Sequence, residues 1–339
     1  MAKAIALFSG GLDSTLSILT ILKQNIEVKA IKFLTPFDHF FSSEDLLSNA
    51  NKFGFEVKVI DISKKFLEIV KNPKFGYGKN MNPCIDCRIL MLKEAKIYMD
   101  EIGADFIISG EVLGQRPMSQ RKETLYCIDR EAGLKDYVLR PLSAKLLRMT
   151  IPETRGTVNR EKLFDFKGRS RKPQMALAKE FGLTEYPAPA GGCLLTEPNY
   201  AYRLKELFTH NPNADIEDVK LLRTGRHFRF SPSCKIIIGR DKDENEKIWS
   251  LSNKDCLLKI EGYGSPTALI VGEITDEAIK VAASLCAKYS DAKNISEVDA
   301  TVIKGDKTFT LRVKPATNEL IEALRIGLKP SKTEIPVTR

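Results

Sequence analysis

The residues that could do chemistry begin near the N-terminus, in the stretch Ser9-Gly10-Gly11-Leu12-Asp13-Ser14-Thr15. An apolar run over residues 4–8 leads into this stretch, and a helical pattern over residues 15–19 leaves it. A strand, a tight turn and a helix N-terminus together bind phosphate, because the first backbone N–H groups of the helix point at the anion. Adjacent glycines add positive φ and close backbone approach. We expect the phosphate to be cradled by Ser9, Gly10, Gly11, Ser14 and Thr15.

The carboxylate of Asp13 is unusual inside an anion-binding loop. Mg²⁺ explains it, since this cation is bound by carboxylate and phosphate oxygens together. The sequence therefore predicts that Asp13 binds Mg²⁺ beside the phosphate. The loop is not a Walker A motif, because the glycine-lysine-serine/threonine ending of that motif is missing.

Cysteines form the second group of candidate residues. Cys84 and Cys87 lie between a glycine-rich loop and a helix expected over residues 89–102, and Cys193 follows two glycines. The positive end of the helix would lower the thiol pKa and favour thiolate. Three arrangements are compatible with this spacing: a persulfide and disulfide relay between two thiols, an iron–sulfur cluster on all three, or zinc with Cys127 as a fourth ligand. We expect the remaining cysteines, which lie in apolar or mixed stretches, to pack as ordinary small hydrophobic residues. They are Cys127, Cys234, Cys256 and Cys286.

The elements that must position these residues alternate along the first part of the chain. Strands are expected over residues 4–8, 26–33, 55–61, 105–111 and 138–142, with helices between them, including one over 44–53. This alternation predicts an α/β fold with a doubly wound parallel sheet, whose ligands lie at the carboxyl ends of the strands. The later chain mixes strands over 235–238, 267–271 and 308–313 with helices over 274–289 and 318–326, which predicts a second, smaller α+β domain.

We therefore expect four parts: a nucleotide-binding domain over residues 1–145, a basic, mostly helical extension over 146–204 that includes Cys193, an α+β domain over 205–326, and a disordered tail over 327–339. The net charge of +9 is concentrated in two stretches. Residues 145–180 hold ten Lys/Arg against four Asp/Glu, and residues 220–240 hold six Lys/Arg and no acidic residue. Such patches fit a polyanionic partner. Candidate RNA contacts are Arg169, Arg171, Lys172, Arg223, Arg226, Arg229 and Lys235.

The composition, 43% hydrophobic and 29% charged, fits a globular protein with a core and excludes a disordered chain. No secretory signal or membrane-spanning apolar run is apparent, so we expect a cytoplasmic protein with no membrane partner.

The glycine-rich loop resembles the PP-loop, SGGxDS, of the N-type ATP pyrophosphatases. Over residues 1–200 the resemblance narrows to the tRNA thiouridine synthases. Gly110-Glu111-x-Leu113-Gly114-Gln115 with Ser119-Gln120 is most similar to the 4-thiouridine synthase, and Asn82-Pro83-Cys84-x-x-Cys87 is closer to the 2-thiouridine synthase. The triplet Arg140-Pro141-Leu142 also matches. Residues 222–240 resemble the RNA-binding NFACT-R type of domain, with arginines interleaved with aromatic residues.

The resemblance implies a reaction. ATP adenylates a uridine carbonyl oxygen, AMP becomes the leaving group, and sulfur enters from a cysteine-desulfurase persulfide or from sulfide. It places adenine near Phe33 and nucleotide contacts at Gly110 and Gln115. We recognise neither the THUMP domain nor the rhodanese domain of the 4-thiouridine enzymes. The three cysteines resemble instead the cluster-containing branch, which implies a [4Fe-4S] cluster on Cys84, Cys87 and Cys193.

Two other functions compete with tRNA thiolation. One is a different N-type ATP pyrophosphatase, such as a 7-cyano-7-deazaguanine synthase, which would not need the basic C-terminal domain. The other is a non-catalytic RNA-binding adaptor with a degenerate nucleotide fold, which the intact Asp13 and the three placed cysteines disfavour.

Overall fold

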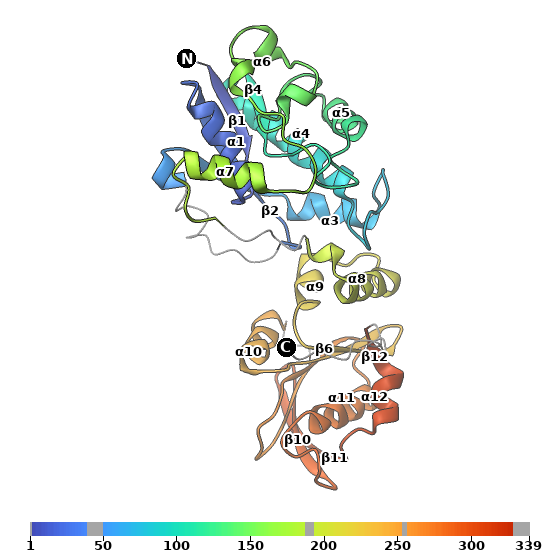
Figure 1. Ribbon diagram of the computed structural model, residues 1–339. Helices are drawn as coiled ribbons and strands as arrows, with labels where there is room; N and C mark the ends of the chain where they lie inside the picture. Colours follow the sequence, from blue (N-terminus) through green and yellow to red (C-terminus); the bar gives the residue numbers. More distant parts are fainter. Residues whose placement is uncertain (1, 39–49, 187–192, 253–255, 328–339) are drawn as a thin grey trace. The chain divides into compact units, whose positions relative to one another are not determined.

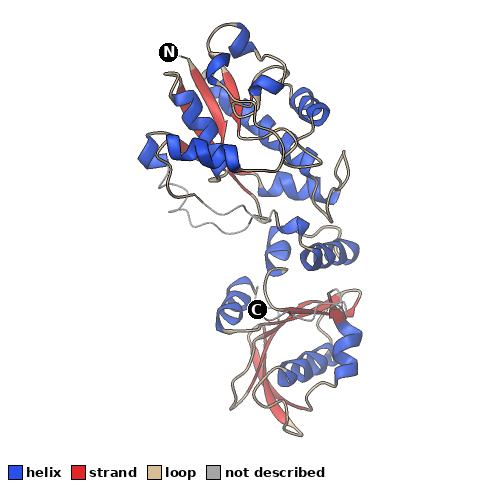
Figure 2. Ribbon diagram, viewed as in Figure 1, coloured by secondary structure: helices blue, strands red, loops and turns tan. Residues whose placement is uncertain are grey.

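A computed structural model describes residues 2–38, 50–186, 193–252 and 256–327 of the 339-residue chain. The chain divides into two compact units, residues 1–196 and 197–339 (Figure 1). Each unit has its own sheet, parallel in the first and antiparallel in the second (Figure 2). The expected fold class, a parallel α/β sheet followed by a smaller α+β domain, is confirmed.

The N-terminal unit is built on a five-stranded parallel sheet in the order β3-β2-β1-β4-β5. The chain runs outward in one direction from β1 and then resumes on its other side at β4. The change of direction makes the carboxyl ends of β1 and β4 the point where such folds bind ligands. The strands are β1 (Lys3–Leu7), β2 (Glu27–Leu34), β3 (Glu56–Asp61), β4 (Phe106–Ser109) and β5 (Val138–Leu139).

Helices cover this sheet. Helix α1 buries Ile18 and Ile21 against Ala4 and Ala6 of β1, and α4 contacts β1 and β4. Helix α7 packs against α1. The helices are α1 (Leu12–Leu22), α3 (Ser63–Lys71), α4 (Cys84–Ile102), α5 (Lys122–Glu131), α6 (Ile151–Thr154) and α7 (Lys172–Glu180), with short 3₁₀ turns at Ala144–Leu146, Arg160–Lys162 and Leu194–Thr196.

Two expectations for this unit need correction. Helix α4 begins at Cys84 rather than near residue 89, so both cysteines of the pair lie inside its first turns. Residues 145–186 are mostly irregular rather than mostly helical, because only α6 and α7 and two 3₁₀ turns form there. Part of the expected helix over 44–53, the loop over 187–192 and almost all of the expected tail lie outside the described residues.

The C-terminal unit contains a seven-stranded sheet in the order β11-β10-β8-β9-β7-β6-β12. Helix α11 covers one face, where Ala282 and Leu285 join the core, and Leu221 and Ile248 pack on the other. The strands are β6 (Arg226–Ser231), β7 (Cys234–Ile238), β8 (Leu257–Ile260), β9 (Ala268–Gly272), β10 (Val298–Lys304), β11 (Lys307–Val313) and β12 (Arg325–Ile326). The helices are α8 (Pro198–His210), α9 (Ile216–Leu221), α10 (Lys242–Leu251), α11 (Asp276–Lys288) and α12 (Asn318–Leu324).

The expected helix over 318–326 ends at Leu324, because Arg325 and Ile326 pair with β6 as β12. Throughout the described part of the chain, the helices are too short or too polar to cross a membrane.

Candidate active site

The glycine-rich loop connects β1 to α1 at the ligand-binding edge of the sheet. Gly10 has a φ of 81°, a conformation that favours glycine. The Ser14 hydroxyl donates to the Gly11 carbonyl at 2.9 Å and accepts from the Ser9 backbone N–H at 3.3 Å. The Ser9 and Ser14 hydroxyls are 3.1 Å apart. These hydrogen bonds join Ser9 to the first turn of α1 and so help to fix the shape of the loop.

Gly110 packs closely against the start of α1, next to the glycine-rich loop. It follows β4, and a Cβ at this position would lie 2.7 Å from the backbone N and Cα of Ser14. A separation this short cannot be tolerated, and backbone atoms cannot swing aside as a side chain can. Gly110 therefore lets the end of β4 lie against the first turn of α1. Packing by itself accounts for a glycine at this position, and the nucleotide contact that the resemblance implies for Gly110 stays a prediction.

Asp13 lies in the first turn of α1 with one oxygen engaged and one available. Its Oδ2 accepts a hydrogen bond from Gln115 Nε2 at 3.0 Å, and its Oδ1 is buried with no hydrogen-bond partner among the described residues. A buried carboxylate oxygen without a partner carries a desolvation cost that a bound cation would offset. The site therefore fits the Mg²⁺ expected from the sequence.

Gln120 closes the loop that carries Gln115. Ser119 and Gln120 are both buried, and Gln120 accepts at its carbonyl from Gly114 N–H at 2.7 Å and at its side chain from Arg116 N–H at 2.9 Å. These bonds fold residues 114–120 into a closed loop beside Asp13. The motif of residues 110–120 thus has a structural role, because Gln120 at its end positions the loop that presents the Gln115 amide to Asp13.

Lys32 is a candidate that the sequence analysis missed. Its Nζ lies 3.4 Å from the Ser9 carbonyl, and burial lowers the pKa of this half-buried ammonium although Asp38 raises it. A cation here would attract the phosphates of a nucleotide in the loop. In the sequence Lys32 is only one polar residue of an alternating strand, so nothing distinguished it. The neighbouring Phe33, predicted to lie near adenine, has a buried side chain.

The structure brings the three predicted thiols together. Cys84 is the first residue of α4 and Cys87 follows one turn later, while the Cys193 thiol donates to the Phe37 carbonyl at 3.6 Å. Cys84 and Cys193 both raise the pKa of Cys87, and Cys84 also raises the pKa of Cys193, so the three thiols lie near one another. None of the seven cysteines, all of which lie in the described part of the chain, forms a disulfide.

These thiols are not poised as thiolates. Burial raises the pKa of Cys84 and raises those of Cys87 and Cys193 to about 12, although Arg88 and Arg116 oppose the rise. The sequence-based expectation of lowered pKa values is therefore wrong, because burial outweighs the helix terminus. In the described parts of the chain, no three His, Cys, Asp or Glu side chains are arranged to hold a metal ion. The iron–sulfur cluster and the zinc site therefore stay predictions, and Cys127 accepts a hydrogen bond from Arg130 Nη2 at 3.7 Å.

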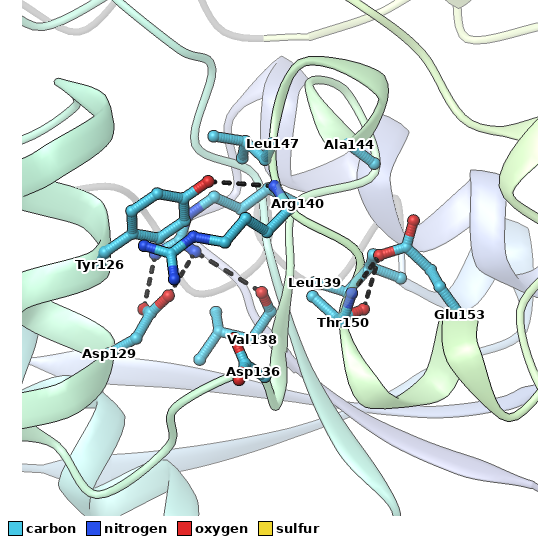
Figure 3. A pocket seen from close by; sticks show the side chains of 11 residues that line it. Tyr126, Asp129, Asp136, Val138, Leu139, Arg140, Ala144, Leu147, Thr150 and Glu153 are labelled. Atoms are coloured by element: carbon cyan, nitrogen blue, oxygen red, sulfur yellow. Dashed lines mark hydrogen bonds and ion pairs between the residues drawn. The ribbon is translucent and has the colours of Figure 1, made fainter.

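Ion pairs link Glu111, at the end of β4, to Arg140 and to α4, which begins at Cys84. Arg140, 2% exposed, binds Asp129 through two hydrogen bonds of 2.8 Å and Glu111 through one of 3.0 Å. Figure 3 shows the guanidinium of Arg140 over Asp129 in a small pocket that contains none of the loop or cysteine residues. Arg88 lies 3.6 Å from Glu111. Burial would raise the pKa of Glu111, but Arg140 and Arg88 bring it below its usual value.

The first basic stretch lies beside the Gln115 loop. Lys167 forms a parallel bridge with Leu113, Gly168 N–H donates to the Leu113 carbonyl at 2.8 Å, and Gly168 lies against Gly114. Arg169 and Lys172 are exposed just beyond this bridge. Among the residues described, no partner meets the buried Nε of Arg171. The predicted cations are therefore tethered near Asp13, on the same unit.

The second predicted patch does not form one exposed face. Arg226 belongs to the α11 side of its strand, while Arg229 and Lys235 face each other on the opposite side. Arg229 is paired with Glu206 at 2.6 Å, and Lys235 is only 5% exposed. Arg223 precedes the strand. Of these four predicted RNA contacts, Arg226 lies near two other arginines that have no place in the prediction, namely Arg240 and Arg325.

Comparisons with known proteins follow the same division. Residues 1–146 match the family model described as thiamine biosynthesis protein (ThiI), and residues 225–325 match the NFACT protein RNA binding domain. A probable tRNA sulfurtransferase of Thermococcus kodakarensis is 30% identical over 41% of this chain and 36% of its own length. The tRNA-specific 2-thiouridylase MnmA of Sulfurimonas denitrificans is 31% identical over 33% of this chain and 36% of its own.

The chain thus spans little more than a third of the length of these relatives. A crystal structure of a 4-thiouridine synthetase–RNA complex with bound ATP has 20% identity and a TM-score of 0.36, over 55% of this chain and 54% of that one. This likeness is too low to support an argument.

The parallel sheet and the SGGxDS loop define the first unit as a PP-loop α/β domain. More particularly, residues 1–146 of this unit are similar to the ThiI family, and residues 225–325 of the second unit are similar to the NFACT protein RNA binding domain. The family resemblance inferred from the motifs is confirmed.

Proposed function

We propose that this protein is a tRNA sulfurtransferase that uses ATP to convert a tRNA uridine to 4-thiouridine or 2-thiouridine. The observation that carries the proposal is the joint placement of the Asp13 loop and three mutually interacting thiols in one unit. The matches to tRNA sulfurtransferase and 2-thiouridylase relatives support the same chemistry. ATP and tRNA are its proposed substrates, so we also propose a cytoplasmic location.

In the first half-reaction, the uridine carbonyl oxygen attacks the α-phosphorus of ATP, and the bond to pyrophosphate breaks. The Ser9–Ser14 loop would hold the pyrophosphate, and Lys32 would supply a nearby positive charge. Asp13 would hold Mg²⁺ through its available Oδ1, and Mg²⁺ would neutralise charge on the leaving group. Gln115 keeps the other oxygen of Asp13 engaged and so fixes the direction of the carboxylate.

In the second half-reaction, sulfur replaces AMP. A cysteine persulfide, charged by a cysteine desulfurase or by sulfide with an oxidant, would attack the activated carbon through its terminal sulfur, and the bond to AMP would break. A second cysteine would then attack the inner sulfur, releasing thiouridine and leaving a disulfide that an external thiol must reduce. We propose Cys84, Cys87 and Cys193 as the source of these two thiols. We propose no step through an iron–sulfur cluster.

The experiment supplies the full chain with a tRNA transcript, ATP, Mg²⁺, a cysteine desulfurase with cysteine, and dithiothreitol. Mass spectrometry of the nucleosides should detect thiouridine with wild type and with Asp105→Asn, an exposed control at the opposite end of the sheet. Asp13→Asn should form none. Pyrophosphate release that does not depend on tRNA, without thiouridine, would point instead to another ATP pyrophosphatase. No pyrophosphate release with any substrate would favour the adaptor.

A further inference from the structure

Four arginines from four elements gather in the C-terminal unit. They are Arg203 of α8, Arg226 of β6, Arg240 in the turn after β7, and Arg325 of β12. Strand pairing sets the positions of two of them, since Arg226 lies opposite Ile238 and Arg325 lies opposite Phe228. Arg240 and Arg325 are near enough to both Arg203 and Arg226 to act on their charges. Directly opposed residues project to the same face, so Arg226 and Arg325 are diagonal neighbours.

Two of these guanidinium groups are fixed by the protein. Arg226 lies 4.4 Å from the centre of the Tyr289 ring, and its Nη1 donates to the Gly239 carbonyl at 3.2 Å. Arg203 Nη1 donates to the Leu222 carbonyl at 3.1 Å. The Nε of Arg203 is buried, with no hydrogen-bond partner in the described part of the unit. Both groups are thus oriented in advance, with donors left over.

The charge of this cluster is not balanced. Glu244 binds Arg240 at 2.9 Å and Glu322 lies 3.5 Å from Arg325, while Asp241 accepts from the N–H of Glu244 at 2.9 Å and so caps α10. Neither Arg203 nor Arg226 forms an ion pair with a carboxylate of the described residues. Burial lowers the pKa of both, and Arg240 and Arg325 lower it further, although Glu244 opposes the change in both and Tyr289 opposes it in Arg226. Like charges gathered at a partly buried place destabilise the protein unless an anion joins them.

We propose that Arg203, Arg226, Arg240 and Arg325 bind a backbone phosphate of the tRNA; the identity of the RNA rests on the proposed function. Arginine suits this ligand because its planar fork of N–H donors matches two phosphate oxygens at once. Arg240 and Arg325, with half or nearly half of each side chain exposed, give the phosphate access. Three of the four arginines lie within or at the end of residues 225–325, the part similar to an RNA-binding domain.

The test measures binding of an unmodified tRNA transcript to the full chain at 50, 100 and 200 mM KCl, within the range of about 50 to 200 mM where phosphate contacts dominate the salt dependence. The variant is Arg240→Gln with Arg325→Gln. The matched control is Arg312→Gln with Lys314→Gln, which removes the same charge from an exposed pair near Glu297 in the same unit. Arg226→Gln is a second, independent variant, and thermal unfolding shows whether each protein folds.

The cluster variant should bind about tenfold more weakly for each charged hydrogen bond to phosphate that it can no longer form, and its log–log salt slope should fall by about 0.9 for each duplex phosphate no longer neutralised. Equal affinity and slope for the cluster and control variants would overturn the inference, as would a wild-type protein that does not bind the transcript. Thiouridine formation is measured separately. Cluster-dependent binding without thiolation would leave this inference standing and refute the proposed function, and thiolation with cluster-independent binding would do the reverse.

Discussion

Lys235 gives the sharpest quantitative prediction. Its ammonium is buried in the sheet of the C-terminal unit, and burial lowers its pKa from 10.5 to about 8 although Glu206 opposes the change. That difference corresponds to about 3 kcal/mol of unfolding free energy by linkage. Methionine has a similar length and no charge. We expect Lys235→Met to stabilise the unit at pH 7 by up to about 3 kcal/mol, since replacing a buried charge with an apolar side chain often does.

The direction of the pH dependence follows from the number of protons that Lys235 binds in the folded and unfolded states. The unfolded chain keeps the Lys235 proton up to about pH 10.5, whereas the folded chain keeps it only up to about pH 8. Between these values the unfolded state holds more protons, so the unfolding free energy of the wild type should rise with pH. Below about pH 8 both states keep the proton, and the destabilisation by the buried charge is complete and no longer depends on pH. In Lys235→Met this contribution to the pH dependence should disappear.

The assay is urea unfolding followed by the fluorescence of Trp249, the single tryptophan of the chain, which lies on α10 of the same unit. The midpoint should rise by up to about 1 to 3 M for urea slopes typical of small domains. Lys259→Met, an exposed lysine of β8, is the matched control and should change the midpoint little. The reasoning is refuted if Lys235→Met unfolds at a lower urea concentration than wild type, or if both show the same dependence on pH.

Three further predictions concern the N-terminal unit. Gly110→Ala should destabilise it by about 1–3 kcal/mol, because the new Cβ meets the Ser14 backbone, and calorimetry together with ATP titration would contradict this if both matched wild type. Arg140→Met should cost about 3–5 kcal/mol by leaving Glu111 and Asp129 buried without their partner, and an unchanged calorimetric transition would argue against the network. Lys32→Met should weaken ATP binding at least about tenfold in titration calorimetry while the unfolding temperature stays near that of wild type, and unchanged affinity would remove Lys32 from the site.

The sequence predicted the sheet of the first unit well because its strands are either apolar runs or alternate apolar with polar residues, and glycines stand at several of the turns between elements. The PP-loop was equally visible, since its function requires fixed residue types at fixed spacing. Lys32 could not be found this way, because its position beside Ser9 depends on which neighbouring strand pairs with β1.

The C-terminal unit was harder to predict. An arginine next to an aromatic residue indicates RNA only if both are exposed, and alternation along β6 and β7 sends Arg229 and Lys235 to the face opposite Arg226. The cluster around Arg226 draws on α8 and β12, which lie about a hundred residues apart in the chain. The pKa of Cys84 was mispredicted for a similar reason. The sequence indicates that a helix begins near this thiol, but it does not show the burial that raises the pKa.

The place where the chain leaves the first unit has a mechanical consequence. That unit ends at Thr196, three residues after Cys193. The intervening residues are fastened by hydrogen bonds from Leu194 N–H to the Phe37 carbonyl at 3.1 Å, from Met81 N–H to the Leu195 carbonyl at 3.2 Å, and from the Asn80 amide to the Thr196 carbonyl at 2.7 Å. Tension along the connection to the second unit would therefore load these three bonds first, and the next residue to feel it would be the one that carries the third thiol.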